Sequence, residues 1–101
     1  MPSIEALEKL LAKDPNDAFV LYGLAQEYAK QRDAARAVEF FDRCLAADPS
    51  YCYAYYHKAK ALAAAGDVAG AKAVIALGQA AAIKYRDGHA QSELDALLDD
   101  L

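Results

Sequence analysis

A short pattern of residues occurs twice in this chain, 34 residues apart. The five residues of segment 11–15 read Leu-Ala-Lys-Asp-Pro, and segment 45–49 repeats four of them. The same shift aligns further identical pairs: Tyr22 with Tyr56, Ala25 with Ala59, Ala29 with Ala63, Asp33 with Asp67, and Ala37 with Ala71. A period of this length is typical of a two-helix unit that buries its apolar face by stacking on its neighbours.

The alanine content supports a helical interpretation. The chain has 101 residues, of which 25 are alanine, a residue that favours helix and lets helices pack closely. A chain of this length forms one domain that buries about two-thirds of its unfolded surface. We therefore expect a single all-α domain.

Capping residues and helix breakers delimit the expected helices. Ser3 and Asp17 are suited to cap two helices at their start, Asp14-Pro15 and Asp48-Pro49 to end two, and Gly66 to end another in a left-handed conformation. A last amphipathic stretch carries Leu94, Leu97, Leu98 and Leu101 on one face. The expected helices span about 4–13, 18–31, 34–47, 50–65, 68–85 and 88–101.

These residues resemble the tetratricopeptide repeat family, whose pattern is a large residue, Leu-Gly, Tyr, then Ala, Phe and a closing Pro. In the first full unit the pattern falls on Leu21, Leu24, Ala25, Tyr28, Ala37, Phe41 and Pro49. In the second it falls on Tyr55, Ala59, Leu62, Ala71, Ile75 and Gly78. The resemblance implies antiparallel helix-turn-helix repeats stacked as a short right-handed α-solenoid.

Two positions depart from the family pattern. Lys58 stands in the usual leucine place, and Ile83 stands where the closing proline belongs, so the last repeat helix is expected to run on. The expected single domain, 1–101, divides into four parts: a half repeat (1–15), a first repeat (17–49), a second repeat (50–84) and a capping helix (88–101). The last helix is interpreted as a solubilising cap, and the alternative is a detachable segment that docks on another chain.

In this family the first helix of each repeat lines a concave inner surface, which implies contact with another protein or peptide. The expected contact residues form a tyrosine-rich groove wall: Phe19, Tyr22, Gln26, Tyr53, Tyr56, His57 and Lys60. Aromatic side chains offer a large contact area at little entropic cost. The expected function is therefore a non-enzymatic adaptor or scaffold that binds a peptide or helix.

Two alternatives stand beside that function. The same face is also suited to self-association, which would make the chain a homodimeric structural module. Tyrosines at helical spacing are also common in cores, and Tyr28, Tyr51, Tyr55 and Tyr85 are expected to be structural. The lysine and asparagine pattern by which some members of the family grip chaperone tails is missing, since Tyr22, Gln26 and His57 stand in those places.

Several other function classes are disfavoured. The net charge of −4 disfavours nucleic acid and anionic membranes as partners. The start of the chain lacks a secretory pattern, so a cytoplasmic location is expected. Cys44 and Cys52 lack metal-ligand spacing, and His57 and His89 lack an oriented nucleophile, so we expect no catalytic site, metal or cofactor.

Overall fold

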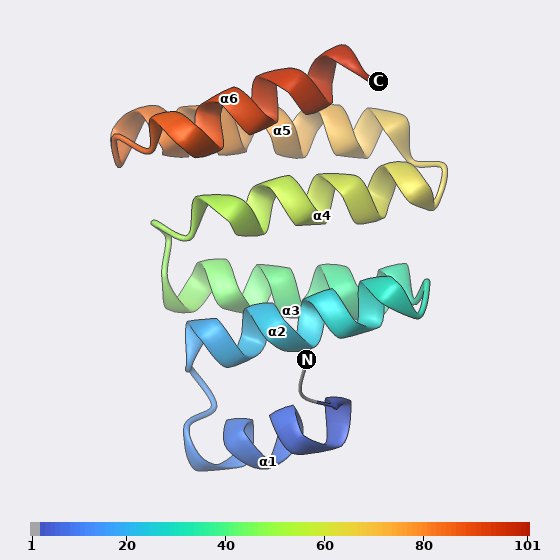
Figure 1. The fold of residues 1–101 in the computed structure, drawn as a ribbon, viewed down its shortest axis with the longest axis vertical. Coiled ribbons are helices and arrows are strands. Elements are labelled where there is room, and N and C mark those ends of the chain that lie inside the picture. The colour runs from blue at the N-terminus through green and yellow to red at the C-terminus, as the bar shows by residue number, and fades with distance from the viewer. Residues whose placement is uncertain (1–2) are drawn as a thin grey trace.

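The computed structural model describes residues 3–101 and contains six α-helices within them (Figure 1). The all-α expectation is confirmed, whereas the part of the expected half repeat formed by residues 1 and 2 lies outside the described residues. The helices are α1 (Ile4–Lys13), α2 (Ala18–Lys30), α3 (Ala34–Ala47), α4 (Cys52–Ala64), α5 (Val68–Lys84) and α6 (Gly88–Asp99).

Aspartate side chains start most of these helices. The carboxylates of Asp17, Asp33, Asp67 and Asp87 each accept a hydrogen bond from the backbone N–H three residues on, as the hydroxyl of Ser3 does for α1. These side chains satisfy backbone donors that have no partner inside the helix. The expected caps Ser3 and Asp17 are therefore confirmed.

The start of α4 differs from the prediction. Ser50 does not begin this helix, because its hydroxyl donates a 2.6 Å hydrogen bond to the Asp48 carboxylate. The helix starts two residues later, after Tyr51, whose side chain makes no capping bond. Ser50 therefore stabilises the turn after α3, which is the local bonding that serine favours outside helices.

Left-handed residues follow three of the helices. Gly66 has a φ of 89° after α4, as expected, and Arg32 and Arg86 adopt φ values of 60° and 57° after α2 and α5. A side chain disfavours this conformation, so the two arginines make their turns at a cost that glycine avoids. The sequence predicts turns at Arg32 and Arg86, but not the left-handed conformation of the two arginines.

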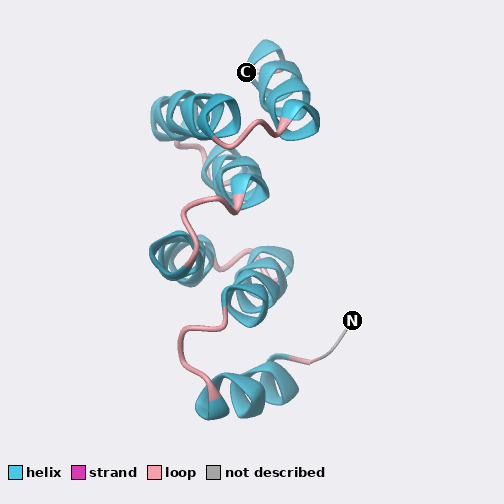
Figure 2. Ribbon diagram, turned by 90° about the vertical axis from the view of Figure 1, so that its left-hand side faces the viewer, coloured by secondary structure: helices cyan, strands magenta, loops and turns pink. Residues whose placement is uncertain are grey.

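The helices stack in two rows along the longest axis of the molecule (Figure 2). One core is centred on α2, α3 and α4, where Leu24, Phe41 and Cys44 are fully buried. A second cluster joins α4, α5 and α6 around Ile75 and Leu94. Each two-helix unit thus buries its apolar face against the next, which is how a helical repeat solenoid is stabilised.

The two departures from the family pattern have different structural outcomes. Lys58 reaches the Asp42 carboxylate with a Nζ to Oδ1 distance of 2.6 Å, and this side chain is only 19% exposed. The lysine stem thereby covers apolar surface while its charge is paired across α3 and α4. At the second position, α5 runs through Ile83 to Lys84 and is 17 residues long, which confirms the expected extension.

Helix α6 packs closely on the preceding repeat. Gly78 allows this approach, since a Cβ atom there would lie 2.7 Å from the Tyr55 Cβ and 3.0 Å from a Leu94 methyl. Gln79 also donates a 2.8 Å hydrogen bond to the Asp95 carboxylate. Helix α6 is therefore held on α5 by the buried Leu94 side chain and by the hydrogen bond to Asp95.

Candidate functional site

Six of the seven predicted contact residues lie in one cluster across α2 and α4. Tyr22 and Gln26 come from α2, whereas Tyr53, Tyr56, His57 and Lys60 come from α4. The exception is Phe19, which is 73% exposed and does not take part in the ring contacts of this cluster. We call this cluster, with Phe19 beside it, the aromatic face.

His57 lies at the centre of the aromatic face. Its ring centroid is 5.7 Å from that of Tyr22 and 5.0 Å from that of Tyr56, both at steep interplanar angles. Tyr53 and Tyr56 also meet edge to face at 6.1 Å, and the Lys60 ammonium lies 5.4 Å from the Tyr56 ring centroid. Edge-to-face pairs and cation contacts of this kind stabilise ring positions, so the surface is ordered without a partner.

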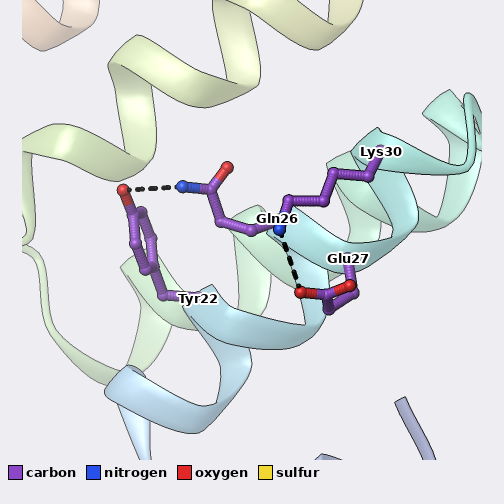
Figure 3. A network of polar contacts seen from close by, with 4 residues as sticks. All are labelled: Tyr22, Gln26, Glu27 and Lys30. Carbon is purple, nitrogen blue, oxygen red and sulfur yellow. Dashed lines mark hydrogen bonds and ion pairs between the residues drawn. The ribbon is translucent and has the colours of Figure 1, made fainter. Parts of the chain in front are cut away.

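A hydrogen bond fixes the α2 side of the face (Figure 3). The Gln26 side-chain amide donates to the Tyr22 hydroxyl over 3.1 Å, one helical turn apart. One turn further along α2, the Lys30 ammonium lies 3.3 Å from the Glu27 carboxylate and is neutralised by it (Figure 3). The face therefore presents tyrosine hydroxyls and an amide over an apolar bed.

Two residues of this cluster were missed by sequence reasoning. The Tyr51 ring lies 4.8 Å from the Tyr22 ring, and the Tyr53 hydroxyl hydrogen-bonds to Nδ1 of His89 in α6. The sequence predicts a structural role for Tyr51 and assigns no contact to His89. The sequence does carry a signal for this contact. His89 follows Tyr53 by 36 residues, close to the 34-residue repeat, and the offset exceeds the repeat because α5 is longer than α3.

Burial shifts the acidity of groups beneath the face. Burial first, and then Tyr51, raises the pKa of Tyr22 to about 12. Burial and the nearby Asp48 raise the pKa of the Cys44 thiol to about 11. Both groups therefore stay protonated near neutral pH, and the buried Cys44 thiol is not an activated nucleophile.

We expect the stability of the protein to fall as the pH is lowered below 6.5. Burial, and secondarily Lys60, lowers the pKa of His57 from its ordinary value of 6.5, although Glu93 acts in the opposite direction. Below that pH the unfolded chain takes up a proton at this residue more readily than the folded chain, so protons favour unfolding. Urea denaturation at about pH 7.5 and about pH 5 measures the difference.

The matched variants His57→Gln and His89→Gln separate the contributions of the two histidines to the pH dependence of stability. His57→Gln should weaken the pH dependence, whereas His89→Gln should retain the part that comes from His57. An unchanged dependence in His57→Gln would contradict the assignment to this residue.

Three shallow hollows on the surface of residues 3–101 have no residue of the aromatic face in their lining. One of about 370 Å³ is lined mainly by alanines with Lys30 and Arg32, and another of about 240 Å³ lies between Pro49, Tyr55 and the outer side of α5. The third lies beside Asn16 and Arg43. In the same part of the chain, no three histidine, cysteine, aspartate or glutamate side chains gather as metal ligands do, and no helix is long and apolar enough to cross a membrane.

Comparison with known proteins identifies the fold family. A model of the tetratricopeptide repeat matches residues 18–51. The TPR repeat-containing protein PA0015 of Pseudomonas aeruginosa is 40% identical over 95 residues, which cover 94% of this chain and 90% of that protein. The chain belongs to the tetratricopeptide repeat family.

Solved structures agree with this assignment. Protein BPP2914 from Bordetella parapertussis superposes with a TM-score of 0.85 at 29% identity, over 99% of this chain and 87% of that one. A tetratricopeptide repeat domain protein from Salinibacter ruber gives 0.73 at 31% identity, over 83% and 93%. Tetratricopeptide repeats generally mediate contacts between proteins and are generally not catalytic.

Proposed function

We propose that this tetratricopeptide protein is a non-enzymatic adaptor that binds a peptide or helix of another protein on its aromatic face. The observation that carries the proposal is the cluster of half-buried rings around His57, which joins the inner helices α2 and α4. Such a surface combines apolar contact area with hydroxyl, amide and ammonium groups at its edge. It suits an amphipathic partner whose apolar side contacts the rings and whose polar groups hydrogen-bond at the edge of the aromatic face.

The mechanism is preorganisation. Gln26 holds Tyr22, His57 lies between Tyr22 and Tyr56, and Tyr53 bonds to His89. Because these side chains are already ordered by each other, little rotamer entropy is lost when a partner binds. Phe19, which is largely exposed on the same helix as Tyr22, extends the apolar area that a partner is able to cover.

To test this function, a peptide that binds the protein is selected from a random display library, and its affinity for the protein is measured. We expect Tyr53→Ser/Tyr56→Ser to weaken binding at least about tenfold, because two aromatic contacts are lost at the centre of the surface. The matched control is Tyr85→Ser, which removes a partly exposed tyrosine after α5. Calorimetric titration measures all three proteins, and circular dichroism verifies their folding.

Equal affinity of the double variant and the control would contradict the proposed contact surface. Failure of extensive selection to yield any peptide that binds the folded chain would contradict peptide recognition. If the double variant instead changes a dimer into a monomer, the aromatic face serves self-association.

A further inference from the structure

Helix α5 exposes an unusual amount of apolar surface on its outer side. Four of the large apolar side chains that lie open to solvent belong to this helix or to the residue after it: Val68, Leu77, Ile83 and Tyr85. Leu77 is 61% exposed and Ile83 is 64% exposed. We call this surface, together with the exposed alanines between these residues, the α5 outer face. Exposed apolar patches of this kind mark sites that another molecule covers.

The equivalent helix of the preceding repeat provides an internal control. Helix α3 carries exposed Glu39, Asp42 and Arg43, and the 34-residue shift replaces them by Ala73, Ala76 and Leu77, which are also exposed. Both helices hold the second position of a repeat in the same stack, so packing within the chain does not require apolar residues there. The loss of charge in α5 therefore indicates a contact outside the chain.

The spacing of these residues favours a helix as the occupant. Ala69, Ala73, Ala76, Ala80 and Ile83 follow one another at intervals of four and three residues along α5, and all are exposed. This alternation is the seam of a two-stranded coiled coil, and small residues within it allow two helix axes to approach closely. Leu77 and Lys84 flank the seam.

The charges around the seam fit a second copy of the chain. The only charged residues within α5 are Lys72 and Lys84, while Asp67 precedes the helix and Arg86 follows it. Two antiparallel copies that cross near Ala76 bring Asp67 of each close to Lys84 and Arg86 of the other. The same register sets Ile83 opposite the small Ala69, which suits close packing.

We propose that the α5 outer face pairs with the same face of a second copy, with the two helices antiparallel and crossing near Ala76. This contact is isologous and closes with two molecules. The outer face of a 17-residue helix is about 25 Å long and about 10 Å wide, so the interface falls below the ~1,200 Å² of stable complexes. The dimer is accordingly weak and forms as concentration rises, and it leaves the aromatic face open.

Sedimentation equilibrium from about 10 µM to about 1 mM tests this proposal. The mass of the natural sequence should rise from the 10.9 kDa of one chain towards twice that value. The variant Ala73→Glu/Leu77→Arg installs the Glu39 and Arg43 side chains of α3 at the equivalent positions, and it should stay monomeric throughout. These sites are exposed and the new pair has favourable helical spacing, so the variant should remain folded.

The matched control Ala35→Glu/Glu39→Arg makes the same kind of change on the outside of α3 and should dimerise like the natural sequence. A monomer at every concentration in the natural sequence would overturn the proposal. So would a dimer that persists in Ala73→Glu/Leu77→Arg.

Crosslinking tests the antiparallel arrangement separately. Cys44 and Cys52 are buried, so an introduced surface cysteine is the preferred target of a short bis-maleimide. Ala76→Cys, at the crossing point, should crosslink efficiently. Ala69→Cys should not, because two copies of that position lie about 21 Å apart along the helices. The reverse result would contradict the proposed arrangement.

Discussion

Replacing Phe41 by alanine should cost about 3 to 5 kcal/mol of unfolding free energy, a large fraction of the stability of a domain this size. Phe41 is fully buried in α3, and its ring lies 6.1 Å from that of Tyr22. Removing the ring leaves a cavity at the centre of the α2, α3 and α4 core, which the packed helices fill only in part. Urea denaturation measures the difference.

Phe19→Ala is the matched control for this prediction. It removes the same side chain from a position that is 73% exposed, and it should change stability by less than about 0.5 kcal/mol. Equal losses in the two variants would show that the burial assigned to these phenylalanines, and with it the repeat register, is wrong.

Gly78→Val should destabilise the protein by about 3 kcal/mol, because α4, α5 and α6 meet at this residue. A Cβ atom added there would lie only 2.7 Å from the Tyr55 Cβ, and valine adds two methyl groups beyond it. The helices must move apart, which exposes Leu94 and strains the Tyr53 to His89 hydrogen bond. Thermal unfolding should show a melting temperature lower by roughly 10 °C or more.

Gly88→Ala provides the comparison. No atom outside the local backbone lies within 4 Å of a Cβ built at Gly88, and this residue begins α6. Alanine there should be neutral or slightly stabilising, since it favours helix more than glycine does. A Gly78→Val protein that melts like Gly88→Ala would contradict the close packing of α6.

Helix positions were predictable because their signals are local. Asp17 precedes α2, and Asp14-Pro15 and Asp48-Pro49 follow α1 and α3, so capping and proline sterics define those ends. Gly66 marks the end of α4 in the same way. The predicted start of α4 at Ser50 was wrong because the Ser50 hydroxyl bonds to Asp48 instead. That bond depends on the geometry of the turn, which the sequence does not show.

The composition of the aromatic face was only partly predictable, because it depends on how helices align across the stack. Tyr22 and Tyr56 were identified from the repeat offset, and the contacts of both with His57 are present. His89 was missed since α5 is longer than α3, which displaces α6 from the simple repeat register. Lys58 was recognised as a departure, but its partner Asp42 lies on another helix and is evident only in the fold.

The division of the chain into a half repeat, two full repeats and a capping helix stays a prediction. The structure gives α6 a packed position beside α5, and the proposed dimer uses α5 without displacing α6. The two proposals thus use separate surfaces of the stack: the aromatic face for another protein and the α5 outer face for a second copy.

The most direct test of the account is an amide chemical-shift map recorded while the selected peptide is titrated into the labelled protein. We predict that the largest shifts fall on α2 and α4 around Tyr22, Tyr56 and His57, with smaller ones at His89 in α6. Residues on the outside of α5, such as Leu77 and Ile83, should not respond to the peptide at a fixed protein concentration. Shifts concentrated on α5 with an unperturbed His57 would contradict the assignment of partner binding to the aromatic face.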